Sequence, residues 1–122
     1  MLEPLKSLFL VRRQEKLART VCLEALDQFR RIHALAPELS GEPLYERVIS
    51  TRFGVDHELA HQMVRRARES YADWPVSRDV RFRDVVHYFI ADRCLKGQAP
   101  TEDHWIRGKI ELVVRSVIPR NL

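Results

Sequence analysis

The chain has 122 residues, of which 45% are hydrophobic and 31% charged, and this balance suits one folded domain with a single hydrophobic core. The four glycines and six prolines are too few for a collagen-like or low-complexity chain, which excludes both classes. The net charge of +4 permits an acidic partner without requiring one. No run of residues is long and apolar enough to predict a membrane span, so we expect no membrane partner.

Apolar residues recur with a helical period along most of the chain, and no run of residues has a clear strand partner. We therefore expect an all-α protein, in which about five helices form a compact orthogonal bundle. The whole chain, residues 1–122, is predicted to be a single domain.

The N-terminal part, residues 2–36, predicts either one long helix or two helices with a break near Arg13. Pro37 is expected to end this segment, because proline cannot continue a helix. A second unit of two helices is expected over residues 43–72. Gly54 divides it, since glycine suits the left-handed position that closes a helix.

The C-terminal part, residues 78–118, predicts two more helices. The first of them is expected to open at Ser77 or Asp79 and to stop at Gly97. Thr101 is the expected cap of the last helix, which has acidic residues in its first turn. Its apolar stripe is expected to be buried.

The two cysteines, Cys22 and Cys94, lie far apart and lack the CxxC spacing of redox and metal motifs. Both fall within apolar helical patterns, so we expect buried free thiols rather than a disulfide. Free thiols are typical of proteins in the reducing cytoplasm, and a cytoplasmic location is therefore predicted.

Residues 57–61 read HELAH, which matches HExxH and looks like the zinc-binding helix of the zincin metallopeptidases. The resemblance implies that His57 and His61 are zinc ligands and that Glu58 is the general base of a hydrolase. No sheet is predicted beside the motif. The structural alternative is a pair of histidines at the edge of the apolar stripe, with a glutamate that favours the helix dipole. A third ligand must come from elsewhere, and four residues are candidates: Glu69, His87, Asp103 and His104.

Residues 46–65 resemble a helix-turn-helix unit. Ile49 takes a buried position of the first helix, and Ser50 is small where the two helices approach each other. Residues 53–55 form a hydrophobic-glycine-hydrophobic turn. Ala60 departs from the pattern, since the family usually prefers a larger aliphatic residue there.

The helix-turn-helix resemblance implies that the helix starting at His57 enters the major groove of DNA. Gln62 and Arg65 would then read bases. Asp56 and Glu58 oppose this reading, because they place negative charge at the leading end of the helix. Three further arginines are expected to contact phosphates: Arg52, Arg66 and Arg68.

The leading prediction is a small non-enzymatic binding or adaptor module, most specifically a helix-turn-helix-like DNA-binding regulator that acts through residues 46–65. Two alternatives stay open: a zinc-dependent hydrolase built on residues 57–61, and a protein–protein interaction domain with no nucleic-acid role. The expected partner is nucleic acid or another protein, and a homodimer is one form that such a partner would take. A cofactor, zinc, is expected only for the hydrolase.

Overall fold

The computed structural model describes residues 3–71, 79–94 and 103–122, and it places the side chains of residues 12–71, 79–93 and 108–122. These ranges contain no strand. Their helices are α1 (Glu3–Leu35), α2 (Gly41–Phe53), α3 (His57–Tyr71), α4 (Phe82–Phe89), a π-helical segment η1 (Ile90–Cys94) and α5 (Asp103–Val117). The prediction of an all-α bundle is confirmed. Within the described ranges, no helix has the length and apolar character needed to cross a membrane.

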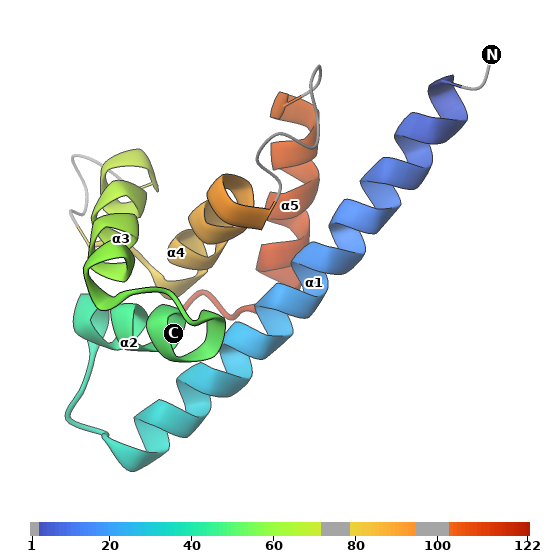
Figure 1. Cartoon of the computed structure of the whole chain (residues 1–122). Helices are drawn as coiled ribbons and strands as arrows, with labels where there is room; N and C mark the ends of the chain where they lie inside the picture. Colours follow the sequence, from blue (N-terminus) through green and yellow to red (C-terminus); the bar gives the residue numbers. More distant parts are fainter. Residues whose placement is uncertain (1–2, 72–78, 95–102) are drawn as a thin grey trace.

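The helices pack around one interior (Figure 1). α1 runs diagonally along one side, where α2 and α5 pack against it. α3 lies on the opposite side and packs on α2 and α4, while α4 lies between α3 and α5. The fold thus leaves α3 at an edge of the bundle and brings α3, α4 and α5 together around a shared space.

The interior is built from the apolar stripes that the helical period predicts. At its centre the ring of Phe82 lies 4.7 Å from that of Phe29 and 5.5 Å from that of Tyr45. These three rings join α4 to α1 and α2. Several large side chains that are fully or almost fully buried surround them: Leu44, Val48, Ile49, Val64, Ile90 and Ile118.

The N-terminal segment forms one unbroken helix, which decides between the two predicted forms. No glycine or proline occurs between Leu5 and Ala36, so nothing in this stretch interrupts the backbone hydrogen bonds. The last backbone hydrogen bond at the C-terminal end of this helix runs from the Ala36 N–H to the Ile32 carbonyl oxygen at 2.8 Å. α1 ends at Leu35, because Pro37 disfavours helical geometry in the residue before it.

The predicted opening of the fourth helix at Asp79 is wrong, because α4 begins at Phe82. Arg81 is the capping residue, and its backbone N–H donates to Asp84 Oδ2 at 3.3 Å. The carboxylate of Asp84, three residues after Arg81, thus accepts the backbone N–H of the capping residue, as the acidic member of a capping box does. η1, which no sequence signal predicted, follows α4 directly. Ser77, Gly97 and Thr101 lie outside the described residues.

Candidate functional site

α2 and α3 meet at a tight corner, as the glycine-containing turn predicts. Gly54 adopts the left-handed conformation, with φ 63° and ψ 26°, which a residue without a side chain reaches at little cost. The Asp56 carbonyl then accepts the N–H of Ala60 at 2.8 Å and so starts α3. Ile49 and Ala60 are completely buried at the corner, so apolar packing joins the two helices there.

The outer face of α3 is open. α2 and α4 lie on the inner side of the helix, which forms an edge of the bundle (Figure 1). Its exposed residues include all but one, Arg68, of the residues of α3 to which the sequence assigns a role in DNA or metal binding: His57, Glu58, His61, Gln62, Arg65, Arg66 and Glu69. These side chains are therefore accessible to a large partner.

Two of the predicted phosphate contacts already have carboxylate partners. Arg52 of α2 forms an ion pair with Glu24 of α1 at 3.2 Å. Arg68 of α3 donates to both carboxylate oxygens of Glu42, at 3.1 and 3.4 Å. These two pairs tie neighbouring helices together. They are partly exposed, and such pairs contribute only about 0.2–1 kcal/mol each.

The other arginines of α3 are less constrained. Arg65 lies 3.7 Å from Glu69 in an exposed pair within the helix. Arg66 has no ion-pair partner among the residues that the structure describes. We call three exposed side chains of this helix the α3 outer patch: Gln62, Arg65 and Arg66.

The two histidines of the HExxH match have different surroundings. His61 Nδ1 lies 2.5 Å from Glu46 Oε1, and the glutamate side chain is only 11% exposed whereas that of His61 is 61% exposed. His57 and Glu58 are exposed. His61 therefore links α3 to a nearly buried carboxylate of α2, an interaction that the motif did not indicate.

The described residues supply no group of three histidine, cysteine or carboxylate side chains that would hold a metal ion. Of the candidate third ligands, Glu69 pairs with Arg65, and His87 lies on α4 with its ring against that of Tyr71. The side chains of Asp103 and His104 lie outside the described residues, as does that of Cys94.

Cys22 is a free thiol, and burial raises its pKa to about 12, so it is a packed core residue rather than a nucleophile.

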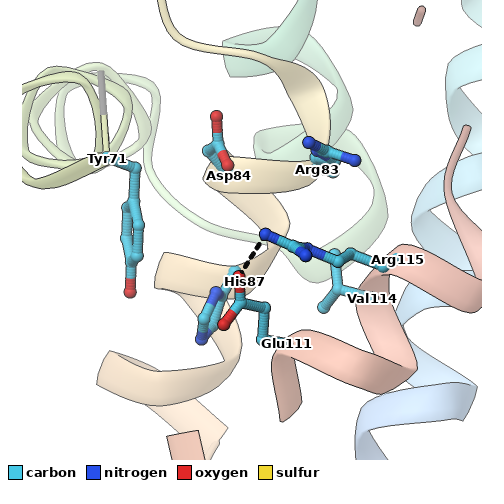
Figure 2. Close-up of a pocket in the computed structure, with 7 residues that line it drawn as sticks. All are labelled: Tyr71, Arg83, Asp84, His87, Glu111, Val114 and Arg115. Carbon is cyan, nitrogen blue, oxygen red and sulfur yellow. Dashed lines mark ion pairs between the residues drawn. The ribbon is translucent and has the colours of Figure 1, made fainter. Parts of the chain in front are cut away.

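A polar cavity of about 220 Å³ lies between α3, α4 and α5 (Figure 2). We call it the interhelical cavity. Buried Val114 forms part of its wall. Six charged, aromatic or histidine side chains line the rest: Tyr71, Arg83, Asp84, His87, Glu111 and Arg115. Among these six, the sequence singled out only His87 as a candidate metal ligand, because side chains from three separate helices converge here and no local motif marks the cavity.

Comparisons with protein-family models, with curated proteins and with solved structures find no match to this chain.

Proposed function

We propose that this protein binds duplex DNA through the outer face of α3, as a non-enzymatic regulator of the helix-turn-helix kind. The observation that carries the proposal is the α3 outer patch, which stands exposed on the helix that follows the Gly54 corner. An exposed helix of this width fits the major groove of DNA. Arginine pairs with guanine through two hydrogen bonds, and glutamine pairs with adenine in the same way.

The charges around α3 favour contact through its middle and C-terminal turns. Asp56 and Glu58 place two carboxylates at the start of the helix, where they repel phosphates. Arg65 and Arg66 lie two turns further on. Arg68 flanks them, and because its pair with Glu42 is partly exposed, it can exchange that carboxylate for a phosphate at small cost.

The proposal predicts that the double substitution Arg65→Ala with Arg66→Ala weakens DNA binding. We expect the affinity for a short fluorescent duplex of random sequence, measured by anisotropy, to fall at least about tenfold at low salt. The slope of log affinity against log salt should fall by about one for each phosphate that the substituted arginines no longer neutralise.

The matched control is Arg12→Ala with Arg13→Ala, which removes the same charge from an adjacent, exposed arginine pair. This pair lies in the N-terminal part of α1, on the side of the bundle opposite α3 (Figure 1). The DNA affinity of this control variant should stay within about twofold of that of the unsubstituted protein. Equal losses in the two double variants, or no salt-dependent binding to DNA at all, would contradict the proposal.

A substitution of Gln62 tests the recognition of DNA bases separately from the overall affinity for DNA. After selection of bound duplexes from a random library, Gln62→Ala should remove an adenine preference at one position of the selected site. Its affinity for random duplexes should change little, because a neutral side chain releases no counterions.

A further inference from the structure

The interhelical cavity is lined by opposite charges rather than by one sign. Arg83 and Arg115 supply two guanidinium groups, and Asp84 and Glu111 supply two carboxylates. The two carboxylates would repel a simple anion in this cavity, and the two guanidinium groups would repel a simple cation. Glu111 already pairs with Arg115, so the charges left for a ligand are those of Arg83 and Asp84 with the spare donors of Arg115, and this mixed lining favours a zwitterion.

The guanidinium of Arg115 forms an ion pair within α5 in which both side chains are about half exposed, 59% for Arg115 and 47% for Glu111. Glu111 Oε1 lies 2.6 Å from Arg115 Nη2, one helical turn away on α5 (Figure 2). One carboxylate uses only part of the donor capacity of a guanidinium, which has five N–H groups. The remaining donors suit a second carboxylate, which guanidinium binds in a planar, two-bonded geometry.

Asp84 is the acidic group that a ligand ammonium would meet. The described residues give its side chain one hydrogen bond, from the Arg81 N–H at 3.3 Å. Burial raises the pKa of this carboxyl despite the nearby charges of Arg83, Arg81 and Arg115, which lower it. A carboxylate withdrawn from water in this way gains from a further cationic donor.

Two rings and one aliphatic side chain form the rest of the wall. The Tyr71 ring lies against the His87 ring, with their centroids 5.0 Å apart, and the almost fully buried Val114 lies on the α5 side. In Figure 2, Tyr71 faces the arginine side of the cavity from the opposite wall. The volume of about 220 Å³ is below the range of drug-sized sites, so the cavity has room only for a small molecule.

We propose that the interhelical cavity binds an α-amino acid with an aliphatic side chain. Its carboxylate lies on Arg83 and Arg115, its ammonium on Asp84, and its side chain against Tyr71 and Val114. The inference is independent of DNA binding, because its test uses the protein without nucleic acid.

The ligand is tested on the unsubstituted protein by calorimetry and by amide chemical shifts. The probes are glycine, alanine, valine and leucine, with leucinamide lacking the carboxylate, N-acetyl-leucine lacking the ammonium, and inorganic phosphate as a simple anion. We expect saturable binding of at least one aliphatic amino acid, with shifts centred on Tyr71 and His87. Leucinamide and N-acetyl-leucine should bind at least about tenfold more weakly than leucine, because each loses one charged contact.

Two substitutions test the assigned roles. Asp84→Asn keeps an oxygen that accepts the Arg81 N–H, so α4 should still form, while Arg83→Gln removes one cation. Each should weaken amino-acid binding about tenfold. Arg47→Gln, an exposed position on α2, is the matched control and should bind as the unsubstituted protein does.

The proposal fails if no aliphatic amino acid produces saturable shifts at Tyr71 and His87. It also fails if inorganic phosphate binds as tightly as any amino acid, or if Asp84→Asn binds with unchanged affinity. The comparison of leucine with its two derivatives needs no substitution, so it decides the matter even if a variant does not fold.

Discussion

Glu46 and His61 lie 15 residues apart in the sequence and in contact in the fold. The glutamate is nearly buried in α2, and the histidine reaches it from the exposed side of α3. A carboxylate that has left water needs a hydrogen-bond donor, because an unpaired buried charge is costly. His61 is therefore a structural partner of Glu46, whereas His57, one turn earlier, is exposed.

This difference predicts that the two histidines of the HExxH match contribute unequally to stability. We expect His61→Ala to lower the free energy of unfolding by about 1–2 kcal/mol, because it leaves Glu46 without its donor. His57→Ala should stay within about 0.5 kcal/mol of the original protein. Urea denaturation measures both values. Similar losses for the two variants would show that Glu46 does not depend on His61.

At the scale of the elements, the corner between α2 and α3 depends on one backbone conformation. Gly54 has a positive φ of 63°, and a Cβ built there would meet nothing within 4 Å. Any cost of a side chain at this position is therefore conformational rather than steric. Gly108, inside α5, also has open space around a Cβ but an ordinary helical conformation.

The two glycines predict opposite effects of the same substitution. Gly54→Ala should destabilise the protein by about 1–2 kcal/mol, because the left-handed conformation is unfavourable for alanine. Gly108→Ala should stabilise it by about 0.5–1 kcal/mol, since alanine is the better helix former. Thermal and urea unfolding test both. A neutral Gly54→Ala would mean that the corner does not need its present geometry.

At the scale of the whole molecule, the aromatic contacts of Phe82 join helices that are distant in sequence. Phe82 of α4 packs on Phe29 of α1 and on Tyr45 of α2, and its side chain has no exposed surface. Because one ring supports three helices, the bundle should unfold as a single cooperative unit.

Phe82→Ala should therefore lower the stability of every helix together. The expected loss is about 3–5 kcal/mol from the removed side chain and the resulting cavity, a large share of the roughly 5–15 kcal/mol typical of a domain. Leu112→Ala, at a side chain that is 63% exposed, should change the stability by no more than about 0.5 kcal/mol. Circular dichroism and tryptophan fluorescence should give coincident transitions. Separate transitions would contradict a single cooperative unit.

Local patterns in the sequence determined the helices themselves. The apolar period predicted an all-α bundle, Gly54 predicted the corner, and Pro37 predicted the end of α1, because each signal acts within a few residues of the structure it specifies. The start of α4 was misplaced, since Arg81, an unusual capping residue whose N–H donates to Asp84, begins the helix, whereas Asp79 was the more obvious cap in the sequence.

Only the tertiary structure decided which side chains meet. The pairing of His61 with Glu46, the partners of Arg52 and Arg68, and the convergence of Tyr71, Asp84 and Arg115 on one cavity each join residues from different helices. Helical periodicity fixes the face on which a residue lies but not the helix that packs against that face. The packing of all the apolar stripes into one interior decides which helices become neighbours. The positions of the charged residues relative to one another follow from that arrangement.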